Sequence, residues 1–212
     1  MVLDMTETSR IKEAYARRKE VVPKGLYSYF NYANLFIIHG RERAILNLLD
    51  KYGMNPLANK VILDLGCGVG GELRNFIRYG ALPQNLYGID LLEDKIEQAR
   101  MFSPNIDFRL GNAEELPYED GSFDMVMQFT VFTSILDDEM KRNIANEMLR
   151  VLSPDGIILW YDYFVSKPTN PDVKGVGKRE MKRLFPNCSF DFNRVTLAPP
   201  IARLIAPWSF LV

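Results

Sequence analysis

The sequence has few of the residues that mark several common classes of protein. Its 212 residues include only two cysteines, Cys67 and Cys188, far apart and outside any CxxC spacing, and one histidine. They indicate neither a disulfide framework nor a zinc or other metal site, and they fit a reducing cytoplasm. The formal net charge of −1 gives no broad basic field, so we expect no nucleic-acid partner.

Long hydrophobic runs are also missing. No stretch approaches the roughly 20 apolar residues that a membrane-spanning helix needs. Residues 1–22 are charged throughout and lack the apolar core of a signal peptide. With 47% hydrophobic and 25% charged residues, the chain is expected to form one sizeable core, to bind a small molecule and to have no membrane span.

What is present is an alternation of short apolar runs with amphipathic segments. Five runs rich in β-branched or aromatic residues are candidate strands: 61–65, 86–90, 106–110, 123–131 and 156–164. Candidate helices follow at 71–80, 91–102 and 137–152, the last with Asp137 as its cap and an SPDG turn after it. Strands joined by helices run parallel through right-handed crossovers. This predicts an α/β fold with a doubly wound, mostly parallel sheet that binds ligands at the carboxyl ends of its strands.

Two flanking regions complete the expected organisation. Residues 1–55, with an aromatic-rich stretch and a helix that Gly53 ends, are interpreted as an N-terminal helical flank or lid. Residues 56–212 are the Rossmann-like core of what is a single structural domain overall, with a sixth strand at 189–198. The apolar end, 198–212, is expected either to dock in a groove or form a homodimer contact, or to mark a chain cut short of a longer natural one.

The stretch VILDLGCGVGGE (61–72) carries the strongest functional signal. Gly66, Gly68 and Gly71 satisfy GxGxxG, and Asp90 follows about 20 residues later, where a carboxylate can bind ribose hydroxyls. A nicotinamide dinucleotide would fit this pattern, but its anionic pyrophosphate is repelled by a carboxylate at Asp64. S-adenosylmethionine has no phosphate and carries two cationic groups, so Asp64 favours it.

These motifs resemble the class I S-adenosylmethionine-dependent methyltransferase family. DLGCGVGG (64–71) is similar to its glycine-rich motif, GIDLLEDKIEQAR (88–100) to its acidic motif, GNAEELPYEDGSFDMV (111–126) to its adenine-contacting segment and LRVLSPDGIILWYD (149–162) to the strand that follows. The resemblance implies S-adenosylmethionine as cofactor, S-adenosylhomocysteine as product and no metal. It implies cofactor contacts by Asp64, Gly66, Gly68, Gly70, Asp90, Leu91, Asn112, Ala113, Glu114, Gln128 and Phe129. Asn112 stands where the family usually has aspartate, and it can accept from the adenine amine only through its amide oxygen.

Methyl transfer is an in-line displacement that needs alignment and, for an alcohol acceptor, a proton acceptor. Candidates for this catalytic role are Asp162 at the end of the fifth strand, His39, and either Tyr29 or Tyr32. We expect methylation of a small molecule or saccharide-type hydroxyl, most directly at oxygen. Because residues 170–183 are rich in basic side chains, a charged acceptor is a further alternative. Alternatives are a nicotinamide-dependent oxidoreductase and a non-catalytic cofactor-binding partner subunit.

Overall fold

The computed structural model describes residues 6–166 and 169–195, which form two compact units. The first contains the described residues up to Tyr15 and those of Pro56–Ser189, and the second contains Ala16–Asn55 and the described residues from Phe190. The boundary expected near residue 55 is one of the places where the chain passes between the units. The flank or lid role of residues 1–55 stays a prediction.

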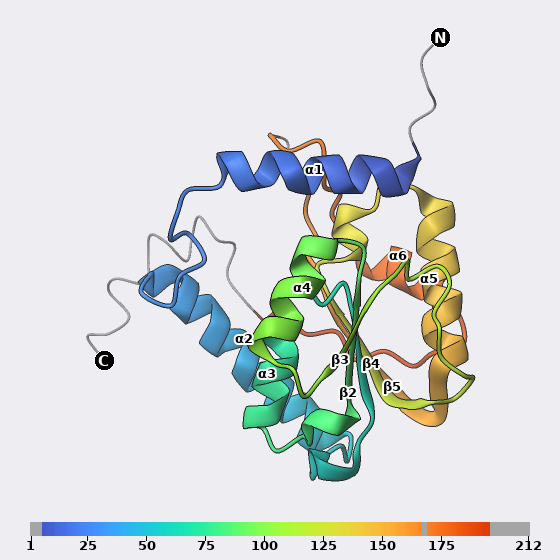
Figure 1. Cartoon of the computed structure of the whole chain (residues 1–212). Coiled ribbons are helices and arrows are strands. Elements are labelled where there is room, and N and C mark those ends of the chain that lie inside the picture. Colours follow the sequence, from blue (N-terminus) through green and yellow to red (C-terminus); the bar gives the residue numbers. More distant parts are fainter. Residues whose placement is uncertain (1–5, 167–168, 196–212) are drawn as a thin grey trace. The chain divides into compact units, whose positions relative to one another are not determined.

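The first unit is built on a sheet of five parallel strands in the order β3-β2-β1-β4-β5 (Figure 1). The strands are β1 Ile62–Leu65, β2 Leu86–Asp90, β3 Asp107–Leu110, β4 Phe123–Phe129 and β5 Leu152–Tyr161. Each falls on one of the five predicted apolar runs. The strand order reverses between β1 and β4, and ligands bind at such a switch point in open α/β sheets.

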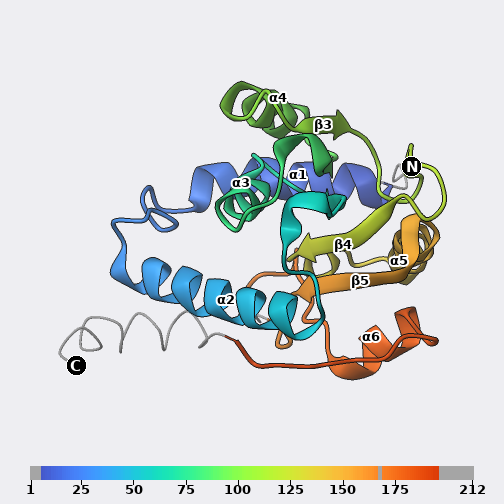
Figure 2. The ribbon, with the colours of Figure 1, turned by 90° about the horizontal axis from the view of Figure 1, so that it is seen from below.

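Helices cover both faces of this sheet, as its doubly wound topology requires. In Figures 1 and 2, α3 (Gly71–Arg78) and α4 (Glu93–Phe102) lie on one side, and α5 (Asp138–Val151) and α6 (Lys178–Leu184) lie on the other. The predicted cap of α5 is confirmed, because the Asp137 side chain accepts a 2.7 Å hydrogen bond from the Met140 N–H. Short 3-10 helices span Leu57–Asn59, Pro83–Asn85 and Phe132–Ser134.

A buried ion pair fastens α6 to α5. The Lys141 side chain on α5 is fully buried, and its Nζ lies 2.7 Å from Glu180 Oε1 on α6. A buried ammonium needs such a partner, because an unpaired charge in the interior is strongly destabilising. The basic helix α6 is therefore attached to α5 through Glu180, the one acidic residue of that helix.

The helices at the N-terminal side are α1 (Glu7–Val21), which begins in the first unit and ends in the second, and α2 (Tyr32–Lys51). Asn31 caps α2, because its Oδ1 accepts from the N–H groups of Ala33 and Asn34. Gly53 ends the helical segment with a φ of +66°, as the sequence predicts. None of the described helices combines the length and apolarity that crossing a membrane requires.

Two predicted local features differ. The SPDG turn after α5 is a bulge inside β5, since Phe123 pairs with Leu152 while Met125 already pairs with Ile157. The sixth strand is wrong over residues 189–195, which have no strand. There the rings of Phe190 and Phe192 stack on each other, with their centroids 5.0 Å apart. Residues 196–198 of that expected strand, and the apolar end to 212, lie outside the described residues.

Candidate active site

A cavity of about 170 Å³ lies at the carboxyl ends of β1, β2 and β4, entirely within the first unit. Its lining takes residues from the loops that follow all of the first four strands and from the helices α1, α4 and α5. The carboxyl edge next to the switch point is therefore hollow, as the strand topology predicts. Seven of the predicted cofactor contacts line it: Gly66, Gly68, Asp90, Leu91, Asn112, Ala113 and Phe129. The other four, Asp64, Gly70, Glu114 and Gln128, do not line the cavity.

The backbone amides of the glycine loop after β1 are hydrogen-bonded to other atoms of the protein. Four N–H groups donate these hydrogen bonds: those of Gly66, Cys67, Gly68 and Gly70. The Gly66 N–H donates to the Ile89 carbonyl at 2.8 Å, and the Gly68 N–H donates to Asp90 Oδ2 at 2.8 Å. A pyrophosphate is bound by loop amides that are free to donate to it. These four amides are already engaged, so the loop suits a phosphate-free adenosine compound better than a dinucleotide.

Two of the loop glycines are required by the space around them. A Cβ on Gly66, whose φ is +65°, would lie 2.6 Å from Val131 Cγ2, and a Cβ on Gly70, whose φ is +74°, would lie 2.5 Å from Phe108 Cζ. Gly66 faces the cavity, whereas Gly70 begins α3 as its cap. Gly70 therefore shapes the loop from outside the cavity.

Asp90, at the end of β2, is the carboxylate that faces the cavity. Its Oδ2 accepts from the Gly68 N–H and its Oδ1 accepts from the Leu92 N–H, at 2.8 and 2.9 Å. Burial raises the pKa of Asp90, against the lowering effect of these two N–H groups and of the Lys95 ammonium. A carboxylate has about four acceptor positions. The two positions not used by these N–H groups can receive the hydroxyls of a ribose.

Asp64 occupies a different position from the one expected of a direct contact. It is 2% exposed within β1, where it pairs with Gly88 and Met127, and it does not line the cavity. Its charge still reaches the loop. The pKa of the neighbouring Cys67 thiol is raised, by burial first and then by the carboxylates of Asp64 and Asp90. A contact of Asp64 with the cofactor stays a prediction, and the geometry supports an electrostatic effect over a direct contact.

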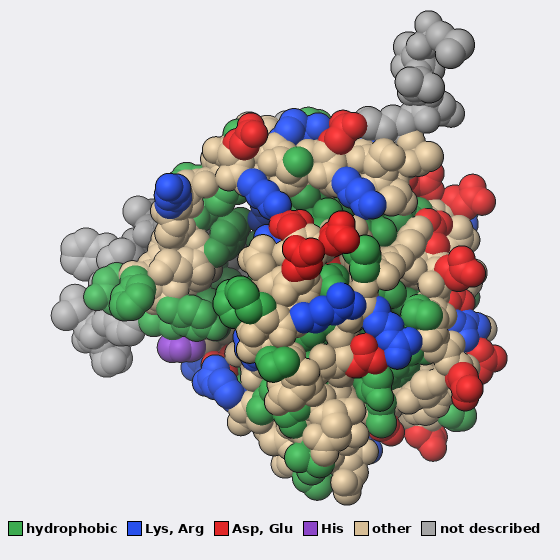
Figure 3. Space-filling view, viewed as in Figure 1, with side chains coloured by type: hydrophobic (Ala, Val, Ile, Leu, Met, Phe, Trp, Pro, Cys, Tyr) green, Lys and Arg blue, Asp and Glu red, His purple; other side chains and the backbone are tan. Residues whose placement is uncertain are grey.

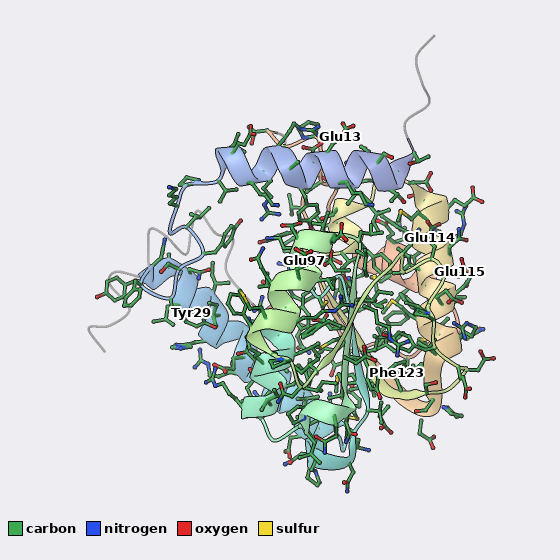
Figure 4. All side chains as sticks on the ribbon, in the orientation of Figure 1. Glu13, Tyr29, Glu97, Glu114, Glu115 and Phe123 are labelled. Carbon is green, nitrogen blue, oxygen red and sulfur yellow. The ribbon has the colours of Figure 1, made fainter. Side chains whose placement is uncertain are left out.

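Asn112 and Glu114 form a local pair in the loop after β3. Asn112 Oδ1 accepts from the Glu114 N–H at 3.1 Å, and Asn112 Nδ2 donates to Glu114 Oε2 at 2.9 Å. Glu114 Oε1 accepts in turn from Asn143 on α5, near which Figure 4 places Glu114. This pairing explains the amide at position 112, because an aspartate there would place a second carboxylate beside that of Glu114, and the two like charges would repel each other.

Asp162, the first candidate for the base, is surrounded by hydrogen-bond donors. Its Oδ2 accepts from Gln128 Nε2 at 2.8 Å and Trp160 Nε1 at 2.7 Å, and its Oδ1 accepts from the N–H and the hydroxyl of Thr133. Burial raises the pKa of Asp162 although all four donors lower it. It does not line the cavity. This geometry favours a structural role for Asp162 in the loop after β4, and its catalytic role stays a prediction.

That loop forms one wall of the cavity and contains a strained residue. Thr130 has a φ of +62°, which is unfavourable for a β-branched side chain. Gln128, 1% exposed, joins the loop to Asp162, because its Oε1 accepts from the Val131 N–H at 2.8 Å. The strained turn therefore depends on bonds to the ends of β4 and β5. It places Val131 against Gly66.

The first part of α1, Glu7–Tyr15, is called the cover segment here. Its Ile11 and Tyr15 line the cavity, and the Tyr15 hydroxyl lies 3.2 Å from Ser134 Oγ, another lining group. These residues were missed in the sequence, where the spacing of four between Ile11 and Tyr15 was the one available signal. The sequence offered no sign of which pocket they would face.

Two ionic groups hold the cover segment to the loop after β4. The Glu7 carboxylate pairs with the Arg10 guanidinium at 2.7 Å and accepts from the Leu136 N–H at 2.6 Å. Arg10 Nη2 also donates to the Ser134 carbonyl at 2.7 Å. The pKa of Glu7 is lowered although its burial acts in the opposite direction, because Arg10 and the Leu136 N–H stabilise its charge.

The remaining catalytic candidates belong to the second unit. His39 on α2 is exposed, and Tyr29 and Tyr32 are 59% and 64% exposed. Their catalytic roles stay predictions. The basic side chains of 170–183 do not line the cavity either, and five of them are exposed: Lys174, Lys178, Arg179, Lys182 and Arg183. Among the described residues, no cluster of three or more His, Cys, Asp or Glu side chains has a geometry suited to a metal ion.

Comparison with known proteins agrees with this arrangement. Residues 62–156 match the family model described as a methyltransferase domain. The chain is 29% identical over 150 residues to norajmaline N-methyltransferase of Rauvolfia serpentina, covering 66% of this chain and 48% of that protein. It is 32% identical over 136 residues to demethylmenaquinone methyltransferase of Lactobacillus johnsonii, covering 61% and 53%. The chain spans about half the length of these curated relatives.

A solved structure supports the fold. An S-adenosylmethionine-dependent methyltransferase from Methanosarcina mazei superposes with a TM-score of 0.56 over 69% of this chain and 85% of that one, at 19% identity. The matched residues 62–156 contain the glycine loop, Asp90, Asn112 and the strained loop after β4. Residues 62–156 therefore carry a methyltransferase domain, and the chain is similar to class I S-adenosylmethionine-dependent methyltransferases.

Proposed function

We propose that the protein transfers a methyl group from S-adenosylmethionine to a small-molecule acceptor, at oxygen. The observation that carries the proposal is the cavity at the switch point, where Asp90 offers two acceptor positions while the loop amides are engaged internally. When bound, the cofactor supplies a methyl group on a positively charged sulfur. The residues of the chain bind it, orient it and exclude water.

The residues that would hold the adenosine part are those at the ends of β2 and β3. Asp90 receives the ribose hydroxyls, and Leu91 and Ala113 flank the base. Asn112 Oδ1 can accept from the adenine amine while it also accepts from the Glu114 N–H, because a carbonyl oxygen has two lone pairs. Asp64 stabilises the positive charge through its electric field. Glu114 and Gln128 support the site without lining it.

The rest of the lining bears on the acceptor. It is largely apolar, with Ile11, Phe129 and Ile135, and its hydroxyl groups include those of Tyr15 and Ser134. A saccharide presents many hydroxyls that would each need a partner, so this wall favours a mostly apolar molecule over a saccharide. The acceptor is expected to be a mostly apolar compound with a nucleophilic oxygen.

We assign orientation of that oxygen to Tyr15. Ser134 Oγ donates to the Thr130 carbonyl at 3.1 Å, so its lone pairs are available to the Tyr15 hydroxyl. Tyr15 is thereby fixed at the cavity wall, where its oxygen can accept a hydrogen bond from the acceptor hydroxyl. Apolar surroundings and exclusion of water then align the two reactants. An acceptor that is already an anion needs no base.

Two further parts of the proposal rest on the sequence. A homodimer through residues 198–212 is proposed from the apolar composition of that segment, which lies outside the described residues. A cytoplasmic location is proposed from the two free thiols, Cys67 and Cys188.

Calorimetry tests the donor. We expect micromolar affinity for S-adenosylhomocysteine and no measurable binding of NAD⁺ or pyrophosphate. Asp90→Ala should weaken binding by about 1.5 to 3 kcal/mol, as for other charge-assisted hydrogen bonds, whereas the exposed control Asp155→Ala should not. Tight NAD⁺ binding would support the oxidoreductase and overturn the proposal.

Turnover is tested with radiolabelled S-adenosylmethionine and a panel of apolar phenols, alcohols and amines. Transfer to oxygen, lowered by Tyr15→Phe without loss of S-adenosylhomocysteine affinity, is the expected result. Methylation of the amines alone would refute the oxygen assignment. Cofactor binding with no transfer to any acceptor of the panel, together with activation of a second protein when the two are mixed, would favour the partner-subunit alternative.

A further inference from the structure

The junction between α1 and α2 exposes large hydrophobic side chains. Phe30 is 96% exposed and Val21 is 76% exposed, and three tyrosines are more than half exposed: Tyr27, Tyr29 and Tyr32. Large apolar side chains gathered at one place on a surface mark an interaction site, whereas scattered ones are ordinary. All five lie in the second unit, within 12 residues of sequence.

Basic side chains accompany these hydrophobic groups. Between residues 16 and 32 the chain has four basic residues, Arg17, Arg18, Lys19 and Lys24, and one acidic residue, Glu20, so this segment carries a net charge of +3. All five of these charged residues are exposed. The whole protein has a net charge of −1, so the segment is locally opposite in sign.

The two kinds of side chain are neighbours in space. The Arg18 guanidinium donates to the Tyr27 hydroxyl at 2.8 Å and lies 5.7 Å from the centre of the Tyr27 ring. Figure 3 shows hydrophobic side chains gathered over the start of α2 with basic ones beside them at the end of α1, and Figure 4 places Tyr29 in this region. Residues 17–32 are called the aromatic–basic patch.

The backbone of the patch is bonded internally. Its turns include hydrogen bonds from the Leu26 N–H to the Pro23 carbonyl at 3.2 Å, and from the Ser28 N–H to the Gly25 carbonyl at 3.0 Å. The Asn31 N–H donates to Ser28 in the same way, at 3.1 Å. Backbone groups that are already paired lower the cost of moving a turn out of water. The patch can therefore place its rings in a less polar medium while its backbone stays satisfied.

We propose that the aromatic–basic patch docks the protein on an anionic membrane surface. Tyrosine and phenylalanine rings sit at the level of the lipid headgroups, and lysine and arginine are attracted to anionic lipids. A protein partner fits less well, because the cores of protein interfaces are depleted in lysine and this patch carries two beside its rings. The described helices do not span a membrane, so the contact is a surface one. It does not depend on the proposed methyl transfer.

Sedimentation with vesicles tests the proposal on the full chain. We expect binding to vesicles of phosphatidylcholine mixed with phosphatidylglycerol, and much weaker binding to pure phosphatidylcholine. Each basic residue near the surface contributes about a fivefold change in binding, so Lys19→Glu with Lys24→Glu should weaken it at least tenfold. Raising the salt concentration should weaken it as well, because the surface potential is screened.

Two further variants separate the apolar part from general stickiness. Val21→Ser with Phe30→Ser should lower binding at least fivefold, whereas Phe164→Ser, which removes a ring 58% exposed elsewhere, should leave it unchanged. Equal binding to both kinds of vesicle, or none to either, overturns the proposal. So does self-association in the ultracentrifuge that Phe30→Ser abolishes, which would make the patch a protein interface. Calorimetry of the same variants with S-adenosylhomocysteine reports separately on the methyl-donor site.

Discussion

Replacing Asp162 by Asn tests whether this residue positions the cavity wall or acts as a base. The carboxylate accepts four hydrogen bonds, two at each oxygen, from Gln128, Trp160 and Thr133. An asparagine retains one acceptor oxygen. If that oxygen faces Gln128 and Trp160, the new NH₂ group faces Thr133, whose hydroxyl can turn to accept but whose backbone N–H cannot.

The opposite orientation is worse, because the NH₂ group would face two N–H donors. Gln128 cannot relieve this by inverting its amide, since its Oε1 accepts from the Val131 N–H. At least one buried donor is left unsatisfied, which costs about 1 to 3 kcal/mol. For a domain of this size that corresponds to a fall in Tm of roughly 2 to 12 °C. The loss should lie toward the lower value near neutral pH, because burial raises the pKa of Asp162 and Asn removes that buried charge.

The assay compares Asp162→Asn and Asp162→Ala with the exposed control Asp155→Asn, by thermal unfolding, S-adenosylhomocysteine affinity and kcat. Loosening of the loop after β4 should weaken cofactor binding in both variants and more strongly in Ala, which removes every acceptor. A base would behave differently. Full thermal stability and unchanged cofactor affinity with complete loss of turnover in both variants would refute the positioning role.

Three other changes address the rest of the site. Gly66→Ala should lower the free energy of unfolding by about 2 to 5 kcal/mol, because of the positive φ and of the 2.6 Å approach to Val131 Cγ2. Val131→Ala should recover part of this loss in a double-mutant cycle of unfolding, and strict additivity of the two changes would contradict the contact. Asn112→Asp should lower S-adenosylhomocysteine affinity in calorimetry and Glu114→Gln should restore it, whereas a gain in the single variant would count against the pair. Because burial raises the pKa of Asp90, cofactor affinity should fall as the pH drops through that raised value. The free protein is relatively stabilised at the same low pH, since the folded state binds the proton more strongly than the unfolded chain does. A cofactor affinity that rises on acidification would exclude the Asp90 carboxylate from the site.

Local sequence patterns were enough to predict the sheet and the side of the cavity that is proposed to bind the methyl donor. Each strand is an apolar run bounded by turn residues, and the cap at Asp137 depends on residues three apart. Gly66, Gly68 and Asp90 line the cavity because parallel strands bring their carboxyl ends to one edge. Where spacing within one segment determines the structure, the sequence is informative.

Contacts between distant segments could not be predicted in this way. Asp162 was interpreted as a base because it ends a strand, but its donors come from residues 128, 133 and 160, and only the folded sheet brings these together. Tyr15 is more than 100 residues from Ser134, its partner at the cavity wall. The bulge at residues 153–156 replaced a local turn signal, because pairing with β4 continues on both sides of it.

The cover segment has a consequence for the speed of the proposed reaction. At about 170 Å³, the cavity is smaller than the roughly 300 to 1,000 Å³ of typical ligand pockets. Widening the cavity at this wall would move Ile11 and Tyr15, and with them the ionic contacts of Glu7 and Arg10. If that movement limits product release, higher ionic strength should hasten successive cycles by weakening the attachment of the helix.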